Sequence, residues 1–128
     1  VTWWKESEAF VRYMNRCSFL LSQGLFVADA LYYYGDDTPN FVFLKEEVTD
    51  LGYGYDWDKC SLDVLLERVR IKNGRILLPD GMSYSILVLP PERAINVDLL
   101  KKLDKLVREG LILVGPKPEK ATGLRGHP

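Results

Sequence analysis

Residues 84–116 read YSILVLPPERAINVDLLKKLDKLVREGLILVGP and decide the fold of this chain. The run Tyr84–Leu89 has no polar alternation after its serine, which predicts a strand buried on both faces, as in a parallel sheet covered by helices. After Asn96, apolar residues recur at three- and four-residue steps opposite a lysine-rich face, which predicts an amphipathic helix with Asn96 as its N-cap. Gly110 follows the last turn, where a left-handed residue is favoured, and residues 111–114 form the next apolar strand. The stretch therefore predicts one right-handed βαβ unit.

The composition is that of one domain. The chain has 128 residues, 47% of them hydrophobic, and this is enough for one core but too little for two ordinary domains. Its net charge of -1 gives no reason to expect nucleic acid or a membrane surface as a partner. Cys17 and Cys60 are expected to be buried thiols on helices, although a disulfide stays open.

An N-terminal helix is predicted from Trp3 and Trp4 toward Gly24, with an apolar stripe along it. The two tryptophans leave two interpretations open. Aromatic faces can stack on pyranose rings, or the pair can pack onto a neighbouring domain, since Trp is favoured at interfaces.

A second buried strand is predicted over residues 25–34, interrupted by Asp29, whose carboxylate then needs a structural partner or belongs to a site. The turn that follows holds Tyr34, Asp36 and Asp37. In open α/β sheets, ligands bind beyond the carboxyl ends of the strands, so these residues lie where a ligand is expected.

Residues 40–58 predict an ordered loop, because glycines and aromatic residues alternate in it. Asp56 and Asp58 are interpreted as caps of a helix over 61–69, although a catalytic pair or a metal site was weighed. Asn73 and the glycine after it predict a hairpin within 69–78. No core pattern continues into residues 117–128.

Several short motifs occur in an order that resembles the α-L-rhamnosidases of glycoside hydrolase family 106. These are TWW (2–4), NRCSFLLSQG (15–24), FVADALY (26–32), GD (35–36), GYDWD (54–58), GRILLPDGMSY (74–84), LVLPP (87–91) and VGPKP (114–118). The resemblance covers nearly the whole chain.

The resemblance implies a fragment of a larger bacterial glycosidase, exported to the periplasm or secreted. Residues 1–24 would be the end of a catalytic barrel, residues 25–116 a flavodoxin-like accessory domain and residues 117–128 a tail. The fold expected is α/β, a three-layer flavodoxin-like (Rossmann-like) parallel sheet with flanking helices and a hairpin insertion. The barrel would be the partner, and its acid and base carboxylates would lie upstream of Val1.

Catalysis by this chain alone is not expected. Glycoside hydrolysis needs two carboxyl groups across a cleft, and no pair stands out. An amidotransferase would need a cysteine on a strand-to-helix turn with a histidine as base, but His127 in the tail is the one histidine. A Rossmann cofactor site would need Gly-x-Gly-x-x-Gly after a strand, which is missing, and no cofactor or metal is predicted.

Two functions remain, an accessory domain of a glycosidase or an independent small-ligand or protein-binding module. The accessory domain predicts a bare apolar patch around Trp3, Trp4 and the first helix. The module predicts a pocket near Tyr34, Asp36 and Tyr55. The residues predicted to contact carbohydrate are Trp3, Trp4, Tyr34, Asp36, Tyr55 and Asp56.

Overall fold

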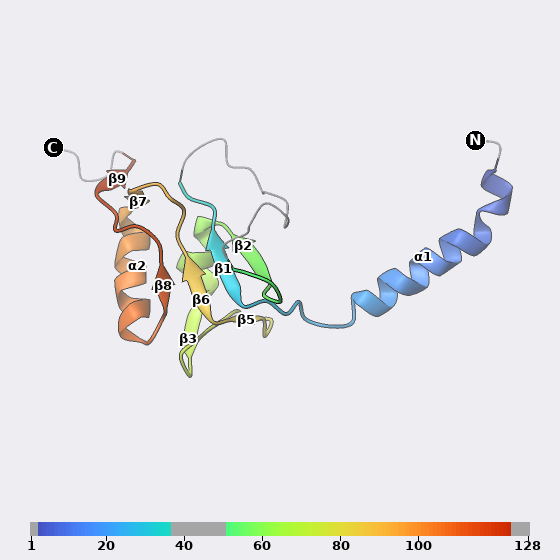
Figure 1. Ribbon diagram of the computed structural model, residues 1–128, viewed down its shortest axis with the longest axis horizontal. Coiled ribbons are helices and arrows are strands. Elements are labelled where there is room, and N and C mark those ends of the chain that lie inside the picture. Colours follow the sequence, from blue (N-terminus) through green and yellow to red (C-terminus); the bar gives the residue numbers. More distant parts are fainter. Residues whose placement is uncertain (1–2, 37–50, 124–128) are drawn as a thin grey trace.

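The computed structural model describes residues 3–36 and 51–123. Figure 1 shows an N-terminal helical segment that stands apart from an α/β body. The segment consists of a 3-10 turn, η1 (Trp4–Glu6), and the helix α1 (Glu8–Leu21). The predicted N-terminal helix is thus confirmed, but Ser7 divides it, with its hydroxyl donating a hydrogen bond to the Trp4 carbonyl oxygen.

A parallel sheet forms the centre of the body. Its strands are β1 (Ala30–Tyr33), β2 (Trp57–Cys60), β6 (Ile86–Val88) and β8 (Leu113–Val114), in the order β2-β1-β6-β8. All three neighbouring pairs are parallel. The predicted α/β class is therefore confirmed.

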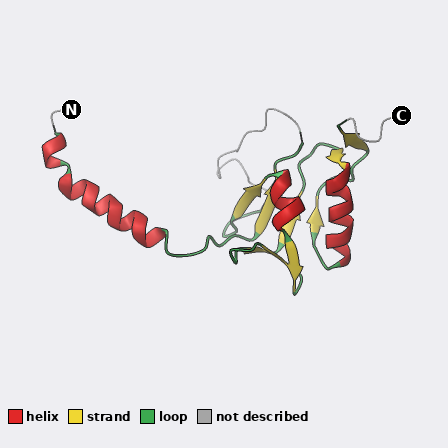
Figure 2. Ribbon diagram, turned by 180° about the vertical axis from the view of Figure 1, so that it is seen from behind, coloured by secondary structure: helices red, strands yellow, loops and turns green. Residues whose placement is uncertain are grey.

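Two helices pack on one face of this sheet (Figure 2). They are the π-helical turn η3 (Val64–Arg68) and α2 (Val97–Arg108), which contact each other. Leu31 and Leu87 of the sheet are almost completely buried beneath them, together with Leu65 of η3 and Leu99 of α2. Asn96 is the N-cap of α2, because its side chain accepts hydrogen bonds from the amides of residues 98 and 99. The predicted βαβ unit is confirmed.

An antiparallel sheet extends from the same body. Its strands β3 (Arg70–Lys72), β4 (Arg75–Leu77) and β5 (Ser83–Tyr84) lie in that order. The turn between β3 and β4 has positive φ angles at Asn73 (53°) and Gly74 (73°), as a two-residue hairpin requires. The hairpin prediction is confirmed.

A second small parallel sheet joins β7 (Ala94–Asn96) to β9 (Lys120–Thr122). β9 lies in the segment for which the sequence predicted no core pattern. Residues 120–122 are thus attached to the body by backbone pairing, next to the start of α2.

The strand predicted over residues 25–34 is wrong in its first half. Only Ala30–Tyr33 forms a strand, and Leu25 and Val27 are 53% and 83% exposed. A run of apolar residues is compatible with a buried strand, but it does not show that the backbone is paired in a sheet. Residues 22–29 instead connect α1 to β1.

The single strand predicted over Tyr84–Leu89 is two strands in different sheets. β5 pairs with β4, and β6 pairs with β1, while Ser85 between them donates its amide to the carbonyl of Asp29 at 2.7 Å. An apolar run does not reveal such a bend, because Tyr84 of β5 and the residues of β6 are all apolar although the two strands pair with different strands.

The strand β2 was not predicted. Trp57 to Cys60 were read as the end of a loop and the start of a helix, with Asp56 and Asp58 as helix caps. Asp56 instead accepts a hydrogen bond from the Trp57 amide, and Asp58 accepts one from the Lys59 amide. The helix predicted over 61–69 corresponds to the shorter η3, whose N-terminus has no side-chain cap.

Both cysteines are free, but only Cys60 is buried, at the end of β2 rather than on a helix, whereas Cys17 is half-buried on α1. Within the described residues, no helix is both long enough and apolar enough to cross a bilayer.

Candidate functional site

Asp36 lies just beyond the carboxyl end of β1 and holds three elements together. One carboxylate oxygen accepts a hydrogen bond from the Tyr33 hydroxyl. The other accepts from the Asn96 amide at 2.6 Å and from the Thr122 hydroxyl at 3.1 Å. Burial raises the pKa of Tyr33 well above its ordinary value, and the Asp36 carboxylate raises it further. The side chain of Asp36 therefore joins β1, β7 and β9 next to the start of α2.

Asp29 and Asp56 form a second link at the opposite, amino-terminal end of the strands. The Asp29 amide donates to the Asp56 carbonyl at 2.8 Å, and the Asp56 amide donates to the Asp29 carboxylate at 3.2 Å. The carboxylate that interrupts the apolar run of residues 25–34 thus has a structural partner, as expected.

The structure does not bring the predicted pocket residues together. Ala30 pairs with Trp57 in a parallel ladder, so Tyr55 precedes β2 at the amino edge of the sheet. Tyr34 and Asp36 follow β1 at the carboxyl edge, with the length of the sheet between the two sets. Among residues 3–36 and 51–123, Tyr55 therefore lies at the opposite end of the strands from Tyr34 and Asp36.

Asp58 is the third carboxylate with a structural partner. Its side chain accepts a hydrogen bond of 2.9 Å from the hydroxyl of Tyr84, which is fully buried. Burial raises the pKa of Tyr84 above its ordinary value, and the neighbouring Asp58 adds to this. Burial likewise raises the pKa of the Cys60 thiol to about 12. The Tyr84 hydroxyl and the Cys60 thiol therefore stay protonated at neutral pH, as is typical of a packed core rather than of groups that transfer protons.

An aromatic cluster that sequence reasoning missed surrounds Lys59. Its ammonium group lies 5.4 Å from the ring centre of Trp57 and 5.6 Å from that of Tyr34. The Tyr32 and Trp57 rings are 5.6 Å apart and tilted by 60°. The alternation of Trp57 and Lys59 could have indicated a strand, but the aspartates between and before them suggested a loop.

No group of three or more potential metal ligands gathers among residues 3–36 and 51–123. His127 lies outside the described residues. Asp36 and Asp58 accept hydrogen bonds from different residues, and the Asp56 carboxylate accepts one from the amide of the next residue, so these three aspartates do not form a pair.

The surface with the clearest functional character is α1, which buries none of its residues. Trp3 and Trp4 are 58% and 67% exposed at its start. The apolar residues exposed on the helix itself are Phe10, Val11, Tyr13, Met14, Phe19, Leu20 and Leu21. An isolated helix of this length is marginal in water, so such a face is typical of one that packs against another surface.

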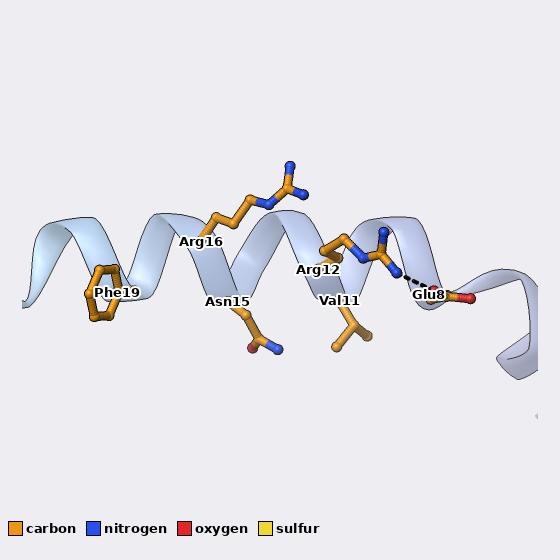
Figure 3. Close-up of a pocket in the computed structure, with 6 residues that line it drawn as sticks. All are labelled: Glu8, Val11, Arg12, Asn15, Arg16 and Phe19. Carbon is orange, nitrogen blue, oxygen red and sulfur yellow. Dashed lines mark hydrogen bonds and ion pairs between the residues drawn. The ribbon is translucent and has the colours of Figure 1, made fainter.

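Figure 3 shows a depression of about 460 Å³ along α1, bordered by Glu8, Val11, Arg12, Asn15, Arg16 and Phe19. All of its side chains come from one helix, and Glu8 pairs with Arg12 one turn away. In the described part of the chain, all six lining residues belong to α1, so the depression does not enclose a ligand. It would become a closed space only against another protein surface.

Comparison with known proteins assigns the family. The family model described as alpha-L-rhamnosidase, glycoside hydrolase family 106, matches residues 1–128. The chain belongs to glycoside hydrolase family 106. The resemblance read from the sequence motifs is therefore confirmed.

Two relatives of this family member cover nearly all of its length. A curated protein of Formosa agariphila, named "Putative beta-glucuronidase", is 39% identical over 126 residues, which are 98% of this chain and 11% of that protein. The solved structure of a rhamnosidase from Novosphingobium sp. PP1Y matches with a TM-score of 0.77 and 27% identity. That match covers 93% of this chain and 12% of the rhamnosidase. The chain thus spans about a tenth of the length of these relatives.

Proposed function

We propose that this chain is a non-catalytic accessory domain of a larger family 106 glycosidase, and that it packs through α1 against the catalytic domain of the same polypeptide. The single observation that carries this proposal is α1, a helix of 14 residues that buries none of them and exposes a row of large apolar side chains. Such a surface is typical of a helix that belongs to an interface.

The comparisons support the proposal through the extent of the matches. A region equal to 11% of one relative and 12% of another leaves most of each relative outside the match. The catalytic carboxylates of the larger enzyme would then lie in another domain.

The carboxylates in the described residues also favour a structural role. Asp36 binds an amide and two hydroxyl groups, Asp56 binds an amide, and Asp58 binds the Tyr84 hydroxyl. A general acid or base must be free to reach a substrate proton, whereas the side chains of Asp36 and Asp58 accept hydrogen bonds that link separate elements.

The fold of the accessory domain is proposed to be flavodoxin-like. Counted along the chain, the four strands lie in the order 2-1-3-4, which is contained in the doubly wound order 2-1-3-4-5. The substrate of the larger enzyme is proposed to be a glycoside. The two relatives are named for different sugars, rhamnose and glucuronic acid, so the test must include both.

The test compares this chain with the longer polypeptide in assays against nitrophenyl α-L-rhamnoside and nitrophenyl β-D-glucuronide. We expect the longer polypeptide to cleave one of them, and this chain neither to cleave the glycosides nor to bind the free sugars. Cleavage by the isolated chain would contradict the proposal. In that case Asp36, Asp56 and Asp58 would be the first residues to substitute.

A further inference from the structure

Exposed apolar side chains continue beyond α1 along the segment that joins it to β1. Leu25 and Val27 are 53% and 83% exposed. A Cβ atom placed on Gly81 would come within 3.0 Å of the Leu25 side chain, so this part of the segment lies against the body rather than free in solution. Flexible linkers are typically rich in Gly and Ser, whereas large aliphatic side chains indicate a segment that is covered.

Two exposed tyrosines precede β2, whose start is tied to the end of this segment. Tyr53 is fully exposed (105%) and Tyr55 is 63% exposed, just before β2 begins. The paired hydrogen bonds between Asp29 and Asp56 hold this part of the chain next to the end of the segment. Leu25, Val27, Tyr53 and Tyr55 therefore share the amino edge of the parallel sheet, and we call them the amino-edge surface.

We propose that the amino-edge surface docks on the same neighbouring domain as α1, so that the two form one continuous interface. This inference rests on the proposed function and deepens it by naming the part of the body that faces the partner. None of the four side chains carries a charge, and tyrosine is enriched in the cores of interfaces.

The length of the connecting segment indicates that the domain that covers α1 is also the partner of the amino-edge surface. Residues 22–29 separate α1 from β1, and a chain fully extended at roughly 3.5 Å per residue spans about 30 Å over this length. A domain that covers α1 is therefore within reach of the amino edge, which is where the segment enters the sheet. The amino-edge surface is the first part of the body that such a partner meets.

The orientation has a consequence for the predicted carbohydrate contacts. Tyr34 and Asp36 lie at the carboxyl edge, at the opposite end of the strands from the proposed interface. Tyr55 lies within the interface. A sugar held by the neighbouring domain would thus be nearer to Tyr55 than to Tyr34 or Asp36.

The test measures how fast an introduced cysteine reacts with a maleimide in the longer polypeptide. The background carries Cys17→Ser and keeps the buried Cys60, and labelling at the introduced site is read by mass spectrometry. Tyr53→Cys probes the amino-edge surface, Phe10→Cys probes α1, and Val107→Cys on the exposed side of α2 is the control. The same proteins in urea give the rate for an uncovered thiol. We expect Tyr53→Cys to react at least about tenfold more slowly than Val107→Cys, which corresponds to an opening free energy of about 1.4 kcal/mol.

The outcomes separate the two proposals. If Phe10→Cys is protected while Tyr53→Cys reacts as fast as Val107→Cys, this inference is wrong and the docking of α1 stands. If both react at the rate of the control, the proposed function fails as well. Protection of Tyr53→Cys only when saturating rhamnose or glucuronate is added would make the tyrosine a carbohydrate contact and overturn the interface.

Discussion

At the residue scale, buried polar groups of this domain act mainly as ties between elements. Asp36 connects Tyr33 to Asn96 and Thr122, and Asp58 accepts from Tyr84. A buried hydroxyl or amide costs free energy unless it is paired, so these contacts fix which elements lie together. No buried side-chain polar atom in the described part of the chain lacks a hydrogen-bond partner.

The buried thiol of Cys60 predicts a loss of stability at alkaline pH. Its pKa is raised from an ordinary value of 9.0 to about 12, first by burial and then by the charge of Asp58. Above pH 9 the unfolded chain releases this proton while the folded chain keeps it, so the free energy of unfolding falls as the pH rises from about 9 to about 12. The slope from this group reaches at most about 1.4 kcal/mol per pH unit.

Urea unfolding at pH 8, 9 and 10 checks this. Cys60→Ala should flatten the pH dependence between 9 and 10, in addition to a constant loss from the smaller side chain. Cys17→Ala, which removes the half-buried cysteine on α1, is the matched control and should keep the slope. An equal slope in Cys60→Ala and the unsubstituted protein would show that the thiol does not carry the effect.

At the element scale, α1 and α2 both carry apolar residues, but only α2 buries them. Both have an apolar face. In α2 that face is buried at Leu99, Leu103 and Leu106, whereas α1 buries none of its residues. Apolar residues that repeat with the helical period predict that one face of the helix is buried, but they do not identify the surface that covers it.

Deleting residues 1–15 should therefore leave the unfolding of the α/β body nearly unchanged, because α1 contributes no buried side chain to the core. In contrast, Leu99→Ala should lower the free energy of unfolding by about 2–5 kcal/mol, since this leucine is fully buried. Urea unfolding followed by the circular dichroism of the α/β body measures both. A loss of cooperative unfolding after the deletion would mean that α1 supports the body, against the proposed docking role.

At the scale of the whole molecule, a bare helix makes the isolated chain prone to self-association. Phe10, Tyr13 and Leu21 are 61%, 62% and 84% exposed, and contiguous apolar surface of this kind promotes contacts between copies in the absence of its partner.

We expect the sedimentation coefficient of the chain to rise with concentration. The double substitution Phe10→Glu and Leu21→Lys should suppress this rise. The new charges sit where the helix dipole favours them, an anion near the N-terminus and a cation near the C-terminus, so the helix itself is retained. Val107→Lys on α2 is the control and should leave the association unchanged. A concentration-independent sedimentation coefficient in the unsubstituted chain would show that the exposed face is not adhesive by itself.

The elements that depend on local pattern could be predicted from the amino-acid sequence. The 84–116 stretch specified β6, α2 and β8 through apolar runs, a 3.6-residue period and the Asn96 cap, and Asn73 with Gly74 specified the hairpin. It also predicted the bare apolar face of α1 and the family. These features are set by neighbours within a few residues or by the motifs quoted above.

The pairing of distant segments, and the site residues that meet as a result, became visible in the three-dimensional structure. β2 forms because Trp57 and Ala30 come together across the chain, and β9 forms because it meets β7 near the Asp36 link. The same parallel register places Tyr55 at the amino edge and Tyr34 at the carboxyl edge, which separates residues that the sequence had grouped in one pocket. Long-range pairing leaves little trace in local pattern, because every residue except proline carries both a backbone donor and a backbone acceptor.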